Sequence, residues 1–112
     1  NKEDSHYERL RENENRLKHA KNVRGKNYEI IPIQQPKYKE FLNHRMALSY
    51  INFYIANGGI VLPIFNDPMD EHAIKTITDV FHDKTVVTLD GTNIVEGGGC
   101  VHCITQQQPI IN

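Results

Sequence analysis

The fold of this chain is decided by residues 49–65, which read SYINFYIANGGIVLPIF. Residues 49–55 alternate between two sets of side chains, which is the period of a strand with two distinct faces. Asn57-Gly58 then precedes the apolar run 60–65, and both residues tolerate the positive φ of a type I′ turn. We therefore predict a β-hairpin with a type I′ turn, whose second strand has a free edge or a bulge at Pro63.

A helix and a third strand are predicted after the hairpin. Asp67 suits the cap position and Pro68 the first helical position, and apolar residues recur at helical spacing over 73–81. Residues 85–89 form a β-branched strand that Asp90-Gly91 ends. The order is strand, strand, helix, strand. One such ββαβ unit cannot bury both its sheet face and its helix face, so we expect further copies.

A surface helix and a short strand are predicted before the hairpin. Ser5 and Glu8 have the spacing of a capping box, and a polar, helix-prone stretch runs from there to about Val23. Gly25 is a suitable C-terminal stop. Residues 28–33 are typical of a strand, and residues 34–40 of a connection.

Composition limits the class of protein. The 112 residues, 38% hydrophobic and 24% charged, fit about one small globular domain. The formal charge of −1 argues against nucleic acid or an anionic bilayer as a partner, and no apolar run reaches the roughly 18 residues of a membrane span. Two cysteines do not make a disulfide framework, so we expect a cytoplasmic protein. The first residue is Asn1, from which we expect a fragment of a longer protein.

The ending, GGGCVHCITQQQP at residues 97–109, places a thiol behind a run of glycines. Three glycines weaken any helix or strand and are typical of a tight turn or of close backbone approach. The backbone of Gly97, Gly98 and Gly99 is therefore predicted to line a substrate pocket beside a sulfur, with a purely conformational turn as the alternative. A cysteine on such a loop can meet a small substrate, and its thiolate is a strong nucleophile.

Neighbouring residues offer other interpretations. Cys100 is either a packing thiol or the partner of Cys103 in a CxxC redox switch. His102 adjoins Cys103, but adjacent residues project in different directions, which favours a structural role over that of a base. Cys100, His102 and Cys103 supply only three ligands within four residues, which argues against zinc. Asn52 either faces the site or satisfies buried backbone.

Four segments together carry a resemblance to a known family. They are SYINFY at 49–54, LPIFNDP at 62–68 with Asp70-Glu71 after it, the ending at 97–109, and the helix over 7–21. In these segments the chain resembles the C-terminal third of agmatine deiminases, which belong with the bacterial peptidylarginine deiminase-like amidinohydrolases. Cys100 departs from the resemblance, because relatives usually carry Gly or Asn there.

The resemblance implies an α/β fold, the pentein, in which five ββαβ modules surround a pseudo-fivefold axis and a central active-site channel. Residues 1–40 would be the end of the fourth module, and residues 41–112 the fifth module with the catalytic cysteine. The chain would thus be the C-terminal part of one domain, with the N-terminal modules as its partner. A homodimer is left open.

The resemblance also implies a reaction, the hydrolysis of agmatine to N-carbamoylputrescine and ammonia on the way to putrescine. The family needs no metal and no organic cofactor. Its cysteine attacks the guanidinium carbon to form an amidino-cysteine intermediate, and the matching residue here is Cys103. Peptidyl-arginine or free arginine as substrate is one alternative. A non-enzymatic remnant with CxxC redox chemistry is another.

Hydrolysis of a guanidinium group requires carboxylates and a histidine beside the cysteine, and no motif in this sequence matches the ones that the family uses. An ordinary thiol with a pKa of ~8.5 is only about 3% thiolate at pH 7, so the site must activate it. Carboxylates must hold the guanidinium, and a histidine must move protons. His82-Asp83 lacks the family's His-x-Asp spacing, and Asp70-Glu71-His72 begins a helix. We therefore predict that the isolated chain is inactive.

Overall fold

The structure, a computed structural model, describes residues 2 and 4–110. The chain divides into two compact units, residues 1–32 (the N-terminal unit) and residues 33–112 (the C-terminal unit). In the described part of the chain, no helix is both long and apolar enough to cross a membrane.

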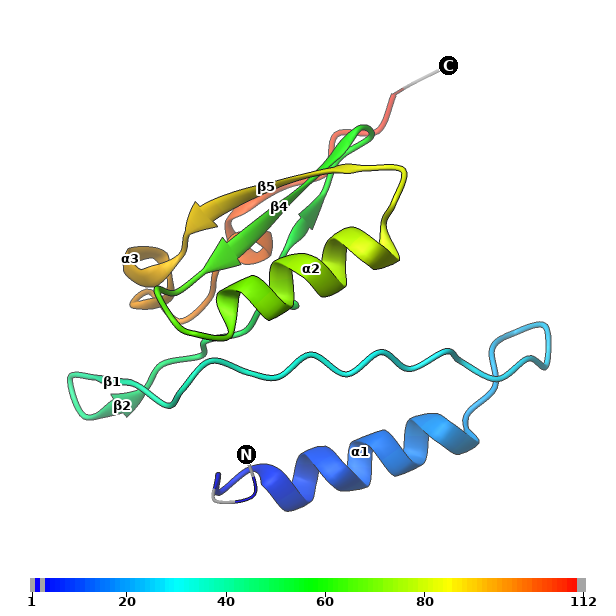
Figure 1. The fold of residues 1–112 in the computed structure, drawn as a ribbon, viewed down its shortest axis with the longest axis horizontal. Coiled ribbons are helices and arrows are strands. Elements are labelled where there is room, and N and C mark those ends of the chain that lie inside the picture. The colour runs from blue at the N-terminus through cyan, green and yellow to red at the C-terminus, as the bar shows by residue number, and fades with distance from the viewer. Residues whose placement is uncertain (1, 3, 111–112) are drawn as a thin grey trace. The chain divides into compact units, whose positions relative to one another are not determined.

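The N-terminal unit contains α1 (Tyr7–His19), a helix with no buried residue (Figure 1). Its surface carries ion pairs one turn apart, such as Lys18 with Glu14 at 2.6 Å. The predicted capping box is wrong, because α1 begins after His6 and has no side-chain cap. The carboxylate of Asp4 instead accepts the backbone N–H of His6 at 2.8 Å and closes a turn ahead of the helix.

The segment after α1 also differs from the prediction. The helix ends at His19 rather than near Val23, because Ala20 is extended. Gly25, at φ +73°, lies in a tight turn between the bridged residues Lys21 and Asn27. The predicted strand at 28–33 is not formed in the described chain, where residues 28–39 belong to no ladder. A strand needs a neighbour to pair its backbone groups, and this stretch has none among the described residues.

The C-terminal unit opens with a small hairpin that the sequence did not predict. It consists of β1 (Glu40–Phe41) and β2 (His44–Arg45), paired antiparallel. Leu42 and Asn43 between them both have positive φ, at 49° and 62°, as the central residues of a type I′ turn do. Leucine is rare in this conformation, so the residue types at these positions do not predict the turn.

The main sheet has three strands, β3 (Tyr54–Ile55), β4 (Gly59–Ile64) and β5 (Thr85–Asp90), in the order β3-β4-β5. β3 and β4 are antiparallel, whereas β4 and β5 are parallel and are joined through α2 (Asp70–Val80). This arrangement confirms the predicted ββαβ order, and the fold is mixed α/β. The arrangement of five modules stays a prediction.

The predicted hairpin between β3 and β4 is present, but two of its details differ. The strand is shorter than 49–55, because the backbone N–H of Asn52 turns back to the carbonyl of Ser49 at 3.2 Å. The turn is not type I′, since neither Asn57 nor Gly58 has positive φ. Pro63 lies beyond the two residues of β4 that pair with β3, so the predicted free edge is found within the described chain.

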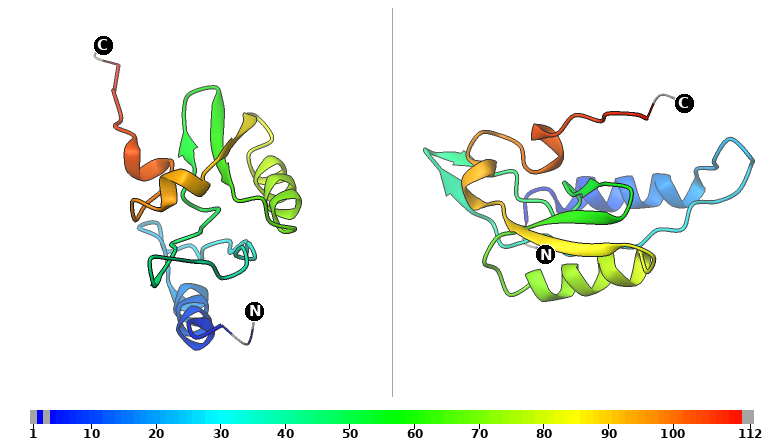
Figure 2. Two further views of the ribbon diagram at one scale, coloured as in Figure 1. Left: turned by 90° about the vertical axis from the view of Figure 1, so that its left-hand side faces the viewer. Right: turned by 90° about the horizontal axis from the view of Figure 1, so that it is seen from above.

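The helix α2 begins at Asp70, two residues later than the predicted first position at Pro68. Asp67 does not cap it; its Oδ1 accepts the backbone N–H of Met69 at 2.9 Å, in a turn that precedes Asp70. From there Ala73 and Ile77 pack into the core. Both views of Figure 2 place α2 on one face of the sheet, and the segment that carries the short helix η1 (His102–Ile104) on the other.

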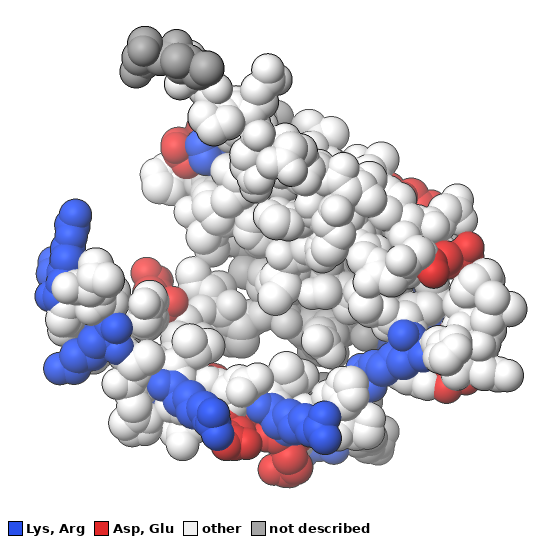
Figure 3. Space-filling model, turned by 180° about the vertical axis from the view of Figure 1, so that it is seen from behind, with Lys and Arg blue, Asp and Glu red and all other residues white. Residues whose placement is uncertain are grey.

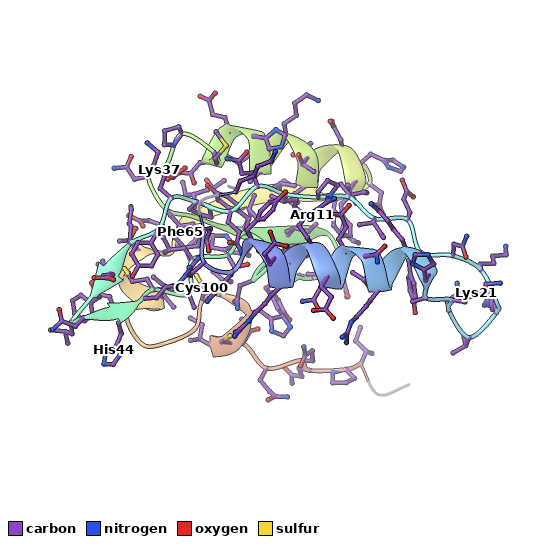
Figure 4. The ribbon with its side chains drawn as sticks, turned by 90° about the horizontal axis from the view of Figure 1, so that it is seen from below. Arg11, Lys21, Lys37, His44, Phe65 and Cys100 are labelled. Atoms are coloured by element: carbon purple, nitrogen blue, oxygen red, sulfur yellow. The ribbon has the colours of Figure 1, made fainter. Side chains whose placement is uncertain are left out.

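The core lies between these layers and includes residues from β4, α2, the segment before β3 and the segment after β5. Figure 4 labels two of them, Phe65 and Cys100, inside this unit. Tyr50 packs against Phe65 with ring centroids 5.6 Å apart and the ring planes tilted by 51°. The fully or nearly buried apolar residues are Leu48, Tyr50, Ile60, Leu62, Pro63, Phe65, Ala73, Ile77, Val95, Cys100 and Val101.

Candidate active site

The candidate nucleophile is presented by the chain that follows β5. After Asp90 the backbone forms the short helix α3 (Thr92–Val95), passes through the glycine run, buries Cys100, and exposes Cys103 within η1. The side of the molecule away from α2 is mostly uncharged over the C-terminal unit (Figure 3). Because Cys100 is buried and Cys103 is exposed, the segment is anchored in the core and presents the thiol of Cys103 at the surface.

The three glycines of the run differ in their contacts. The backbone N–H groups of Gly97 and Gly98 donate to the carbonyls of Ile94 and Val95 and end α3, and Gly98 has a φ of +92°. Gly99 is the one that meets the sulfur: a Cβ there would lie 2.7 Å from Cβ and 2.9 Å from Sγ of Cys103. The geometry thus brings only Gly99 of the run against Cys103.

Asn52 is the side chain that contacts the candidate nucleophile. Its Nδ2 donates a hydrogen bond to Sγ of Cys103 at 3.1 Å, and its Oδ1 accepts the backbone N–H of His102 at 2.9 Å. Asn52 precedes β3, fifty-one positions before Cys103. The sequence left open whether Asn52 faces the site or satisfies backbone, and in the structure its side chain does both.

The pKa of the Cys103 thiol is lowered. The largest cause is the hydrogen bond from Asn52, followed by the backbone N–H of Cys100; partial desolvation opposes them, and the residue's own backbone adds to the lowering. Among the described residues no charged side chain contributes to this shift. The thiolate is thus favoured by dipoles rather than by a neighbouring charge.

Cys100 is a packing thiol in this structure. It is fully buried, and burial raises the pKa of its thiol despite the backbone N–H of Val101. Its Sγ fills the space beside Gly91, where an added Cβ would lie only 2.7 Å from the sulfur. Cys100 and Cys103 are both free thiols, one buried and one exposed.

The backbone of His102 anchors the segment that carries Cys103 in the described chain. Its backbone N–H is held by Asn52, and its carbonyl accepts the hydroxyl of Thr105 at 2.8 Å. No hydrogen bond joins its imidazole to Cys103 among the residues that the structure describes. Nor do residues 2 and 4–110 contain three His, Cys, Asp or Glu side chains placed to hold a metal ion.

The acidic residues after β4 build the loop rather than the site. Asp70 accepts the hydroxyl of Tyr50 at 2.7 Å and the backbone N–H groups of Phe65 and Asp67. Asp67 accepts the backbone N–H of Lys37 at 3.0 Å. Burial works to raise the pKa of Asp67, but its hydrogen bonds and the nearby lysines leave that pKa lowered. These carboxylates are therefore committed to the fold.

Comparison with known proteins supplies the context of the site. The family model described as Porphyromonas-type peptidyl-arginine deiminase matches residues 1–109. A Legionella pneumophila (strain Paris) protein, named as a candidate agmatine deiminase, is 42% identical over 109 residues, 96% of this chain and 32% of that protein. The agmatine deiminase of Stutzerimonas stutzeri (strain A1501) is 52% identical over 65 residues, 58% of this chain and 18% of that protein.

Solved structures of similar proteins contain the same fold as this chain. The structure of an agmatine deiminase of Enterococcus faecalis superimposes with a TM-score of 0.80 at 28% identity, covering 96% of this chain and 35% of that one. The chain thus spans about a third of the length of the first relatives it matches.

Proposed function

Because the chain belongs to the Porphyromonas-type peptidyl-arginine deiminase family, we propose that Cys103 is the nucleophile of an enzyme that hydrolyses a guanidino group, with agmatine as substrate. The observation that carries this proposal is the exposed thiol with a lowered pKa, held by Asn52 beside Gly99. Agmatine is preferred because the relative from Stutzerimonas stutzeri is named as an agmatine deiminase.

The proposed reaction has two steps. The thiolate of Cys103 attacks the guanidinium carbon and forms a C–S bond; a proton passes to one nitrogen, the C–N bond breaks, and ammonia leaves. Water then attacks the same carbon, the C–S bond breaks with its electron pair returning to sulfur, and N-carbamoylputrescine is released. The carboxylates that hold the guanidinium and the base that moves the protons would come from modules that precede this part.

The proposal is tested by substituting each thiol in the complete protein. Cys103→Ser should lower ammonia release from agmatine by at least about a thousandfold, as loss of a nucleophile does. Cys100→Ala, the matched change at the buried thiol, should leave most of the activity. Wild-type turnover in Cys103→Ser would refute the role of Cys103.

Peptidyl-arginine is the second candidate substrate, favoured by the description of the family model. The complete protein should be assayed with agmatine, free arginine and an arginine-containing peptide at equal concentration. A higher kcat/KM for agmatine supports the proposal, and a higher value for the peptide would transfer it to peptidyl-arginine. A five-module arrangement is also proposed, and a structure of the complete protein would test it.

A further inference from the structure

The amide of Asn52 can be placed in only one orientation. Its Oδ1 faces the backbone N–H of His102, which is a donor, and its Nδ2 faces the sulfur of Cys103. A flipped amide would set two N–H donors against each other at His102 and leave the sulfur without a donor. The hydrogen-bond network therefore directs an N–H group at the sulfur.

Asn52 is itself held by the fold. Its backbone N–H donates to the carbonyl of Ser49 at 3.2 Å, and its backbone carbonyl accepts the N–H of His102 at 3.2 Å. It lies between the buried Tyr50 and strand β3. The donor is thus fixed from the core, whereas the sulfur that it meets is exposed.

We propose that Asn52 is the positioning residue of Cys103, which orients its sulfur and stabilises its thiolate through the side-chain amide. An amide N–H donates more strongly to a negative sulfur than to a neutral thiol, so the contact favours the anion. An amide cannot accept the proton, and Asn52 is therefore not a base. This inference rests on the proposed function only for the role of Cys103 in turnover.

The surroundings of the sulfur make the contribution of Asn52 measurable. Among the described residues, the titratable group that interacts with Cys103 is the buried thiol of Cys100, and no charged side chain contributes to the lowered pKa. The other favourable contributions come from backbone N–H groups. A change in the side chain at position 52 should therefore appear directly in the thiol titration.

The test is the rate at which iodoacetamide alkylates Cys103 in the complete protein, measured from pH 6 to 10 and assigned by peptide mapping. Asn52→Asp keeps an acceptor for the N–H of His102 but places a carboxylate against the sulfur. We expect the pH midpoint to rise by at least about one unit and the rate at pH 7 to fall about tenfold. Asn52→Ser, which removes the amide without adding charge, should give a smaller shift in the same direction.

Asn57→Asp is the matched control, because it makes the same change on the exposed turn after β3. It should alkylate with the wild-type profile. Wild-type profiles in both Asn52→Asp and Asn52→Ser would overturn the inference, as would equal shifts in Asn52→Asp and Asn57→Asp. Should Asn52→Asp not fold, as judged by circular dichroism, the profile of Asn52→Ser decides alone.

The alkylation assay separates this inference from the proposed function. A shifted thiol titration with no turnover of agmatine, arginine or peptidyl-arginine by the wild-type protein would support Asn52 and refute the deiminase. Normal turnover with unshifted titrations would support the deiminase and refute Asn52. A purely structural role would change the melting temperature without moving the pH midpoint.

Discussion

At the scale of single residues, the candidate site depends on two close contacts of the Cys103 sulfur. Gly99 lies against Cys103 on one side, and the amide of Asn52 donates to it from another. A glycine with no room for a methyl group and an amide with one usable orientation both fix where the sulfur lies. The exposed thiol is therefore positioned although it is not buried.

Gly99→Ala should displace the nucleophile. The new Cβ would lie 2.7 Å from Cβ and 2.9 Å from Sγ of Cys103, distances that real structures avoid, so the segment must shift. We expect at least a hundredfold loss of kcat in the complete protein, since small misplacements of reacting groups cost about this much. The measurement is ammonia release, with circular dichroism as the test of folding.

Gly97→Ala is the control for that substitution. A Cβ at Gly97 would meet the carbonyl oxygen of Ile94 at 3.4 Å, an ordinary contact, and its φ is not positive. Activity within about threefold of wild type is expected, because no reacting group has to move. Equal losses in both variants would show that any side chain in the run is harmful and that the contact of Gly99 with Cys103 is not specific.

At the scale of elements, the junction between β4 and α2 is organised by one carboxylate. Asp70 collects the hydroxyl of Tyr50 and two backbone N–H groups, and burial together with this hydrogen bond raises the pKa of Tyr50. The first turn of the helix is thereby tied to the residue two positions before Asn52.

Asp70→Ala should destabilise the protein by about 2 to 3 kcal/mol, because it leaves several donors without an acceptor. Tyr50→Phe, which removes one hydrogen bond, should cost about 1 kcal/mol. Asp79→Ala in the same helix changes only an exposed ion pair with Lys75 and should cost less than about 0.5 kcal/mol. Denaturant unfolding measures all three, and equal losses at Asp70 and Asp79 would contradict this account.

The turn between β1 and β2 contains a leucine in a left-handed conformation. Leu42 holds a φ of +49° with its side chain 77% exposed, so the conformation is strained and little packing offsets it. Leu42→Asn should stabilise the protein by about 0.5 to 1 kcal/mol, because Asn tolerates this region. Ile104→Asn, at a residue that is also exposed but has no positive φ, should not stabilise it. Thermal unfolding decides between them.

At the scale of the whole molecule, the described neighbours of Cys103 supply hydrogen-bond donors but no charge. The site favours a thiolate, and among the described residues no charged side chain contributes to the lowered pKa of Cys103. The chain also spans about a third of the length of its first relatives. The chemistry of the complete enzyme is therefore expected to be divided between this part and the rest.

The isolated 112-residue chain should thus release no ammonia from agmatine, whereas the complete protein should do so. Alkylation of Cys103 in the isolated chain is the internal control, because it reports whether the thiol is present and accessible. Turnover by the isolated chain would contradict this division of the site.

The sequence alone predicted the ββαβ order and a hairpin at Asn57-Gly58, which the structure confirms, and Cys103 as nucleophile, which stays a prediction. These features follow from period, turn residues and a local motif, all of which are short-range. The family resemblance, carried by the same short motifs, agrees with the match of residues 1–109. Local patterns were less reliable at element boundaries, as the later start of α2 at Asp70 and the shorter β3 demonstrate.

The contacts of Asn52 and Asp70 become visible only in the folded chain. Each acts through a contact in three dimensions: Asn52 reaches a sulfur fifty-one positions away, and Asp70 joins a helix to a residue before the sheet. The strand expected at 28–33 is absent from the described chain for the related reason that a strand exists only with a partner. Contacts distant in sequence leave no periodic signal, and so they become visible only when the chain is folded.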